Sequence, residues 1–231
     1  MKKLTSLTLA VLLLAVLAPS VIPSSWAAGE TMVSTFAELV AALESGKETI
    51  YITADIEFPE VIAFPMFLDF WSNAYKEGDF TEIHFTGNSL ALIGVAKADG
   101  SNPVLRSGKS TVDRLLSVSF GSEERKLKSP GSITLENLTW DGGGVMIDNR
   151  VNLAVRNCVF QNIGVDADDD DPPGALLVSH NGAETDRSHA SIENCLFRNN
   201  GGWNLLASAE LLTVRNTRFI GQQGFVCRLT R

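Results

Sequence analysis

The sequence predicts an all-β protein: a right-handed parallel β-helix, built as a three-faced solenoid with a capping helix at its N-terminal end. An eight-residue pattern recurs four times in the second half of the chain, at residues 133–140, 153–160, 190–197 and 212–219. Every copy carries asparagine at its fifth position, and short apolar runs lie between the copies. Because one such repeat cannot bury its own apolar face, it is stable only when neighbouring copies stack.

The spacing of the asparagines matches the length of a solenoid coil. Asn137, Asn157, Asn194 and Asn216 follow at intervals of 20, 37 and 22 residues. The interval of 37 equals one coil of 22 residues plus an insertion of 15, which we assign to the Asp-rich stretch near residues 165–173. Strands of successive coils would lie about 4.8 Å apart. The runs expected to form the third face are Val145–Ile147, Leu176–Val178, Leu205–Ala207 and Phe225–Cys227.

Stacking would place equivalent side chains in ladders. The asparagines fit the tight turn, because Asn tolerates unusual backbone angles and its amide can bond along the stack. The inward ladders are Leu135, Val155, Ile192 and Val214, then Leu138, Cys158, Cys195 and Thr217, and finally Trp140, Phe160, Phe197 and Phe219.

Outward side chains of alternating charge precede the asparagines. They are Glu136, Arg156, Glu193 and Arg215. We interpret them as a structural cross-strand ladder, in which a pair contributes roughly 0.2–1 kcal/mol.

The N-terminus has the features of an export signal. Lys2 and Lys3 precede the apolar stretch Leu7–Leu17, which is too short to span a membrane comfortably. Small residues at Ser25 and Ala27 predict cleavage after Ala27 and a secreted or cell-surface protein. An uncleaved anchor is the alternative, and no later segment predicts a membrane span.

Charge excludes one class of partner. Loss of residues 1–27 removes two lysines and no acid, so the formal charge changes from −8 to −10. An acidic exported domain is a poor nucleic-acid binder, because phosphate contacts need a basic face.

Three regions follow from these patterns: the signal peptide 1–27, a segment 28–82 and the coils 83–231. Within 28–82, Thr35–Glu44 predicts an amphipathic helix, with Thr35 and Glu38 as a capping box. First strands follow, and then an apolar stretch at 57–80 without a clear period, which we interpret as a partly helical insertion. The last coil is incomplete, which predicts a C-terminal capping partner or a truncated fragment of a longer repeat protein.

The coil pattern, with its stacked asparagines, resembles the right-handed parallel β-helix superfamily typified by pectate lyases. The resemblance covers about residues 83–227 and extends to the N-terminal capping helix. Gly174–Leu176 and Phe197–Asn200 are also similar to repeats of polymorphic outer-membrane adhesins. The first resemblance implies clustered carboxylates, often with calcium, and an arginine or lysine base. The motifs of the lyases, galacturonan hydrolases and pectin esterases are absent from this sequence.

Loops between the second and third faces should emerge along one edge of the stack. They carry carboxylates, amides and one tryptophan, the groups that bind sugar hydroxyls and cover apolar sugar faces. The predicted ligand-binding residues are Asp141, Asn199, Asn200, Trp203, Gln222 and Gln223. The alternative is that Trp203 packs under its own loop.

An aspartate run is the most unusual segment. Calcium takes several oxygen ligands, so the run is a candidate Ca²⁺ site, although a solvated loop is the simpler interpretation. No other cofactor is expected. The candidate metal ligands are Asp166, Asp168, Asp169, Asp170 and Asp171.

Cysteines and histidines give weaker signals. The odd set of Cys158, Cys195 and Cys227 is no disulfide framework. Cys158 and Cys195 fit a disulfide or a buried thiol stack equally well. His180 and His189 are placed in a surface loop, where metal binding is the less favoured interpretation.

These observations favour a non-catalytic, adhesin-like surface protein that binds glycan or another surface partner. The enzymatic alternative is a polysaccharide lyase, or less readily a glycoside hydrolase, acting on acidic polysaccharide. Asp141 and Asp168 are its weak catalytic candidates.

Overall fold

The computed structural model describes residues 30–58, 64–69, 80–84, 89–107, 114–119, 131–148, 152–165, 174–179, 189–209, 211–221 and 227–229. Residues Thr31–Arg231 form one compact unit. The predicted signal peptide lies outside the described residues, so its cleavage stays a prediction.

The unit is mostly β and consists of three sheets, in which every pair of neighbouring strands is parallel. Sheet A contains, in spatial order, β1 (Thr31–Val33), β2 (Thr49–Ile52), β6 (Ser89–Gly94), β9 (Ser132–Glu136), β12 (Asn152–Arg156), β15 (His189–Glu193) and β18 (Leu211–Arg215). Sheet B contains β3 (Ile56–Phe58), β7 (Val104–Ser107), β10 (Thr139–Asp141), β13 (Val159–Gln161), β16 (Leu196–Arg198) and β19 (Arg218–Ile220). Sheet C contains β5 (Phe80–His84), β4 (Phe64–Asp69), β8 (Arg114–Ser119), β11 (Gly144–Asp148), β14 (Leu176–Ser179), β17 (Leu205–Ala207) and β20 (Cys227–Leu229).

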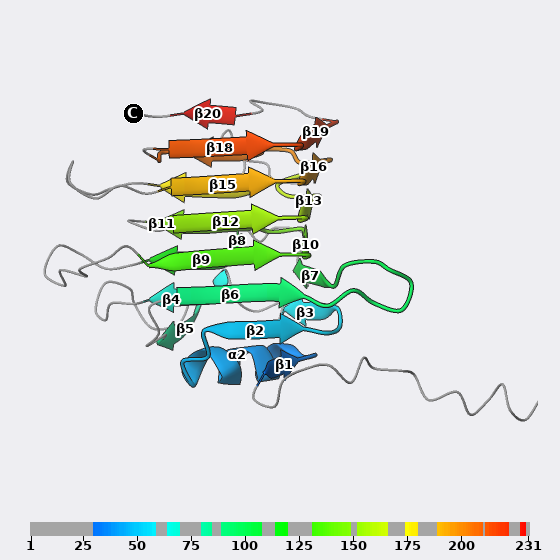
Figure 1. Ribbon diagram of the computed structural model, residues 1–231, viewed down its shortest axis with the longest axis vertical. Helices are drawn as coiled ribbons and strands as arrows, with labels where there is room; N and C mark the ends of the chain where they lie inside the picture. The colour runs from blue at the N-terminus through cyan, green and yellow to red at the C-terminus, as the bar shows by residue number, and fades with distance from the viewer. Residues whose placement is uncertain are drawn as a thin grey trace, which may run out of the picture. The chain divides into compact units, whose positions relative to one another are not determined.

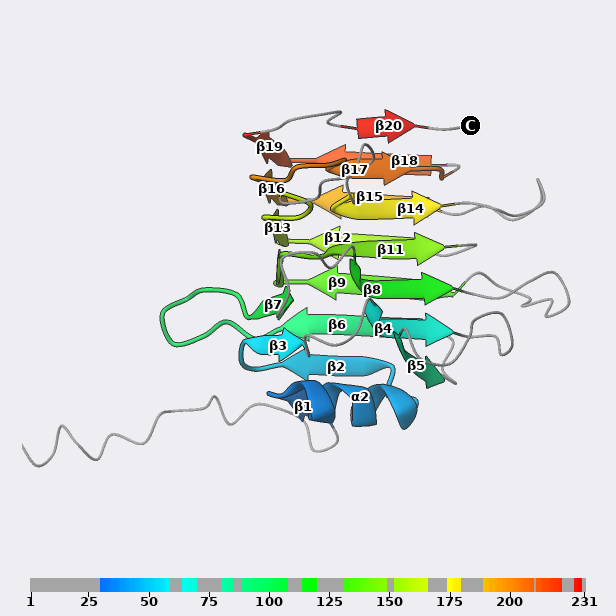
Figure 2. The same cartoon turned by 180° about the vertical axis from the view of Figure 1, so that it is seen from behind.

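The chain visits the three sheets in turn. It passes from β9 in sheet A to β10 in sheet B and β11 in sheet C, and then returns to sheet A at β12. Figure 1 shows the strands of sheet A stacked on one another, and Figure 2 shows sheet C from behind. This arrangement of stacked parallel strands is compatible with a solenoid-like fold.

Helix α2 (Phe36–Glu44) lies at the N-terminal end of the strands, as the sequence predicts. Its capping box is confirmed, because Glu38 N–H donates to Thr35 Oγ1 at 3.3 Å and Thr35 N–H donates to Glu38 Oε2 at 3.2 Å. Leu39 and Leu43 are fully buried against the core. Within the described part of the chain, no helix has the length and apolar character needed to cross a membrane.

The described pieces of the apolar segment 57–80 belong to strands. We predicted a partly helical insertion there, but Glu57 and Phe58 belong to β3, and the later pieces belong to β4 and β5, which pair with each other in sheet C. Residues 59–63 and 70–79 lie outside the described residues, so for them the insertion stays a prediction.

The predicted inward ladders are in register. Val155 pairs with Leu135 and with Ile192, and Ile192 pairs with Val214. The rings of Trp140, Phe160, Phe197 and Phe219 stack with centroid separations of 6.3, 4.8 and 5.0 Å. The first three aromatic residues are fully buried, so this ladder is part of the core.

The last strand of sheet C corrects one prediction. We expected Phe225–Cys227 to form the last strand of the third face, with Phe225 opposite Leu205, but Cys227 of β20 pairs with Leu205. Phe225 and Val226 lie outside the described residues. The register differs from the predicted one by two residues. Because side chains alternate along a strand with a period of two, this shift leaves the pattern of inward and outward side chains unchanged.

Candidate functional site

Asparagines with left-handed backbone angles form the corner between sheets A and B. Asn137, Asn157, Asn194 and Asn216 have φ values of 55°, 53°, 55° and 49°. Asn157 Nδ2 donates to Asn137 Oδ1 at 3.0 Å. The predicted asparagine turn is therefore confirmed, with an amide bond along the stack between the first two.

The corner between sheets B and C also turns at residues with positive φ. Gly142, Asn162, Asn199 and Gly221 follow β10, β13, β16 and β19, and each has a positive φ between 52° and 79°. The turns after these four strands therefore lie along one edge of the stack, as the sequence predicts. This edge brings together two of the predicted ligand-binding residues, Asp141 and Asn199.

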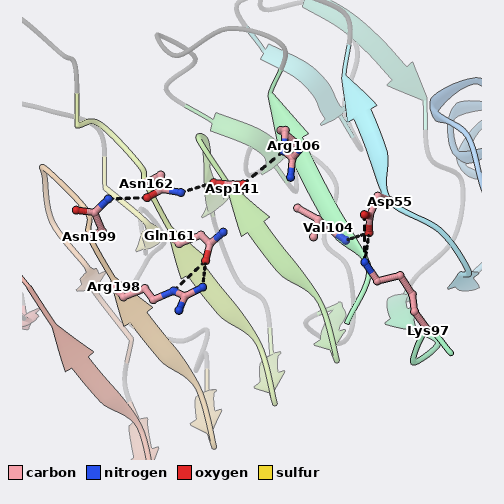
Figure 3. A network of polar contacts seen from close by, with 9 residues as sticks. All are labelled: Asp55, Lys97, Val104, Arg106, Asp141, Gln161, Asn162, Arg198 and Asn199. Atoms are coloured by element: carbon pink, nitrogen blue, oxygen red, sulfur yellow. Dashed lines mark hydrogen bonds and ion pairs between the residues drawn. The ribbon is translucent and has the colours of Figure 1, made fainter. Parts of the chain in front are cut away.

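A chain of polar contacts runs along this edge (Figure 3). Asn199 Nδ2 donates to Asn162 Oδ1 at 2.6 Å, and Asn162 Nδ2 donates to Asp141 Oδ1 at 2.7 Å. The other carboxylate oxygen of Asp141 forms an ion pair with Arg106 Nε at 3.4 Å. We call Arg106, Asp141, Asn162 and Asn199 the corner ladder. Arg106 and Asn162 were not among the predicted site residues, although Asn162 follows the aromatic residue by the same two positions as Asn199.

A row of polar side chains lies beside the corner ladder on the outer face of sheet B. Pairing between strands places Glu57 opposite Arg106, Arg106 opposite Asp141, and Gln161 opposite Arg198. Arg198 Nε donates to Gln161 Oε1 at 2.9 Å. The strands on both sides of Arg106 therefore carry an acidic residue at the paired position, and Asp141 is the one in ion-pair contact with its guanidinium.

Asp55 joins the next strands of the same face. Lys97 Nζ lies 2.9 Å from Asp55 Oδ1, and Val104 N–H donates to the same oxygen at 2.8 Å. Burial acts to raise the pKa of Asp55. The hydrogen bonds from Lys97 and Val104 and the positive charges of Lys97 and Arg106 outweigh burial and lower that pKa below its usual value.

Asn200 lies inside the turn and not on its surface. It is 2% exposed. Its Oδ1 accepts from Ile163 N–H at 3.1 Å, and its Nδ2 donates to Phe160 O at 3.2 Å and to Asn204 Oδ1 at 2.9 Å. The side chain of Asn200 therefore holds the turn from within, a role that its position in the sequence does not reveal.

Trp203 is half-buried in the same loop. Its carbonyl accepts a hydrogen bond from Ala175 N–H at 2.6 Å, which ties the loop to the start of β14, the neighbouring strand of sheet C. Ligand binding by Asp141, Asn199, Asn200 and Trp203 stays a prediction.

The remaining predicted site residues lie outside the described residues. They are Asp166, Asp168, Asp169, Asp170, Asp171, Gln222 and Gln223. The calcium site therefore stays a prediction as well. Among residues that the structure describes, no group of three or more His, Cys, Asp or Glu side chains could hold a metal ion.

An open groove with a volume of about 420 Å³ lies on the outer face of sheet A. It crosses β9, β12, β15 and β18, and sequence analysis did not predict it. Its outward-facing lining residues are Ser132, Thr134, Asn152, Ala154, His189, Ser191, Leu211 and Thr213. We call this feature the sheet A groove.

Strand pairing explains why the face is hollow. Thr134, Ala154, Ser191 and Thr213 occupy one row across the four strands, and all four side chains are short. The next outward row along the strands consists of the long side chains Glu136, Arg156, Glu193 and Arg215. Short side chains beside long ones leave the hollow.

The groove offers several polar groups. Within the described part of the chain, the hydroxyls of Thr134 and Thr213 have no protein partner. Asn152 Oδ1 accepts from His189 N–H at 3.3 Å. His189 is exposed at the start of β15, whereas we predicted that it lies in a loop. Leu211 adds apolar surface with 52% of its area exposed.

The alternating charged row is confirmed in register but not in contact. Arg156 pairs with Glu136 and Glu193, and Glu193 pairs with Arg215. The ion pairs Lys97–Asp55 and Arg106–Asp141 lie elsewhere, and among the described residues none involves Glu136, Arg156, Glu193 or Arg215. The charged side chains of this row are therefore not joined to one another by ion pairs.

Cys158 and Cys195 are free, buried thiols that directly precede the neighbouring strands β13 and β16. Burial raises the pKa of both thiols. Because a thiol reacts as its thiolate, the buried pair has little nucleophilic character in the folded chain.

Comparison with known proteins names no relative. No family model matches the chain, and neither the curated proteins nor the solved structures contain a match.

Proposed function

We propose that this chain is an exported right-handed parallel β-helix that acts at the cell surface or outside the cell, and that it binds a linear glycan in the sheet A groove without catalysis. Three parallel sheets visited in turn support the β-helix. The apolar N-terminal segment and its small-residue cleavage motif support export.

The groove is the observation that carries the proposal. Ligand sites are typically concave and combine apolar surface with a few polar groups. Here the Thr134 and Thr213 hydroxyls and the Asn152 amide can exchange hydrogen bonds with sugar hydroxyls. Ala154 and Leu211 supply apolar surface for the CH face of a sugar ring.

The direction of the groove favours a polymer. It crosses four parallel strands, and neighbouring strands of a sheet lie about 4.8 Å apart. A linear glycan along the stack would therefore meet equivalent positions of successive strands. The row from Glu136 to Arg215 would lie beside it.

A groove-filling variant tests the proposal. Ala154→Arg places a long charged side chain at the centre of the short row, so we expect loss of retention on a glycan array. Asn199→Ala and Trp203→Ala are matched variants at the B–C edge, and we expect them to bind normally.

Two outcomes would count against the groove. Retention by Ala154→Arg that equals that of the unchanged protein would exclude it. Loss of retention only in Asn199→Ala or Trp203→Ala would place the ligand at the B–C edge. Circular dichroism of every variant reports whether the sheets remain folded.

The row Glu57–Arg106–Asp141 favours a second candidate function, a polysaccharide lyase. Such an enzyme needs carboxylates and a basic side chain close together, and this row supplies them on three neighbouring strands. A lyase acting on acidic polysaccharide with Ca²⁺ would release unsaturated products that absorb ultraviolet light. A substrate panel without such products would leave binding as the function.

A further inference from the structure

The two ends of the stacked sheets differ in charge and in cover. β18, β19 and β20 are the last strands of sheets A, B and C, and each pairs with one described strand only. At the other end, β1 is the last strand of sheet A, and α2 lies beside it. Among the residues that the structure describes, one end of the unit is therefore formed by strand edges, and the other end carries a helix.

Apolar side chains are exposed at the end formed by strand edges. Val214 belongs to the inward aliphatic ladder, yet it is 40% exposed, whereas Leu135, Val155 and Ile192 are fully buried. Ile220 on β19 is 52% exposed. Exposed strand edges with apolar side chains are templates for pairing with another chain.

Charge indicates which surface can cover this end. Arg215 and Arg218 are exposed on β18 and β19. Two such ends brought together would oppose arginines with arginines. The exposed face of α2 carries Glu38 and Glu44 together with the small residues Ala37 and Ala41, so it is acidic and permits close approach.

We propose that a second copy of this chain stacks head-to-tail, with its β1 and α2 placed on β18 and β19 of the first copy. All strands of sheet A are parallel, so β1 of the second copy extends the sheet in the same direction. In the register of the sheet itself, Thr31 pairs with Ile50, which belongs to the column that ends at Val214. Thr31 of the second copy therefore lies opposite Val214. Met32, which is outward and 42% exposed, lies opposite Arg215.

This association leaves one end of each kind free. It is therefore heterologous and open-ended, and it produces a series of oligomers and not a closed dimer. The inference does not rest on the glycan proposal, because it is argued from the strand edges, the exposed side chains and the charges at the two ends of the stack.

Sedimentation of the purified protein at increasing concentration provides the first test. We expect a concentration-dependent series of species that shrinks at high salt, because charge pairs at exposed rims are screened. The double variant Arg215→Glu with Arg218→Glu should weaken association by about tenfold or more. A protein that stays monomeric at every concentration would overturn the proposal.

Charge reversal on the helix identifies the partner surface. Glu44→Arg alone should also weaken association, because it opposes arginines across the contact. A mixture of the Arg215→Glu, Arg218→Glu variant with Glu44→Arg should associate again. Failure of the mixture to associate, while the unchanged protein does, would exclude α2 as the covering surface.

Engineered cysteines test the register and the direction. Cross-linking should join Val214→Cys in one copy to Thr31→Cys in another, because the two positions are opposed in the register of sheet A. Val214→Cys alone should give no covalent dimer. A dimer formed by Val214→Cys alone would mean tail-to-tail contact and would overturn the head-to-tail arrangement.

Discussion

Asparagine at the A–B corner serves both the backbone and the stack. A positive φ costs most residues free energy, because the Cβ crowds the carbonyl, whereas Asn is tolerated there. Asn157 has φ 53°, donates its amide to Asn137, and accepts a hydrogen bond at its carbonyl from Asn102 Nδ2 at 3.0 Å. One residue type therefore satisfies the turn geometry and links two coils.

Two substitutions at this corner separate the contribution of the amide hydrogen bond to stability from the contribution of the positive φ. Asn157→Ala should lower the free energy of unfolding by about 1–2 kcal/mol, because it loses the ladder bond and keeps the strained φ. Asn157→Gly should cost less, because glycine adopts this φ freely and only the bond is lost. Urea denaturation measures both. An alanine variant as stable as the unchanged protein would contradict a role for the left-handed turn.

Single residues also mark the limit of prediction from sequence. Asn199 and Asn200 are adjacent amides in one loop, and both were predicted to bind ligand. The structure exposes the first and buries the second. Alternation fixes which side chains point inward along a strand, but it does not continue through a turn that positive φ values redirect. The sequence could therefore place the loop on the correct edge without separating its two amides.

At the scale of elements, the aromatic ladder joins four strands of sheet B. The rings of Phe160 and Phe197 are nearly parallel, with an interplanar angle of 6° and centroids 4.8 Å apart. This separation matches the spacing of the strands themselves. The stacked rings therefore pack each coil against the next one.

The loss of stability caused by removing one ring of this ladder should depend on where that ring lies. Phe160→Ala removes a fully buried ring with aromatic neighbours on both sides, so we expect a loss of about 3–5 kcal/mol. Phe219→Ala, the matched control, should cost clearly less, because that ring is half-buried and lies at the end of the ladder. Thermal or urea unfolding compares the two. Equal losses would mean that the ladder does not act through burial between coils.

The inward ladders could be predicted because burial forces apolar side chains to recur at fixed positions. The sheet A groove could not, because outward Ser, Thr and Ala residues are common on any exposed strand. Only strand pairing reveals that Thr134, Ala154, Ser191 and Thr213 form one row of short side chains. The same reason explains His189, whose place at the start of β15 has no apolar signal in the sequence.

At the scale of the whole molecule, charge is unevenly distributed. The formal charge of −8 makes the chain acidic, yet arginines occur at regular places across the strands and at the exposed end of sheets A and B. Two acidic side chains form ion pairs with cationic groups: Asp55 with Lys97, and Asp141 with Arg106. Stability should therefore depend on pH through carboxylates such as Asp55, which connects the start of sheet B to Lys97 and Val104.

The sign of this dependence follows from the lowered pKa of Asp55 in the folded chain. The unfolded group titrates near the ordinary value of about 3.9. The stabilisation is therefore fully present above that pH, and it is lost as the pH falls through the lower folded pKa. Asp55→Asn removes the charge and keeps an oxygen that can accept from Val104 N–H. At pH 7 the variant should lose about 0.5–1 kcal/mol, because the carboxylate is half-exposed and screened.

Urea denaturation at pH 7 and at pH 3 measures the difference directly. We expect the difference in free energy of unfolding between Asp55→Asn and the unchanged protein to become smaller at the lower pH. The reason is that protonation removes from Asp55 the same charge that the substitution removes. Lys97→Met is the matched control, because it removes the cation. In a protein that carries Lys97→Met, Asp55→Asn should lower the free energy of unfolding at pH 7 by less. A difference of equal size at both pH values would mean that the charge of Asp55 does not stabilise the stack. The contribution would then belong to the backbone hydrogen bond alone.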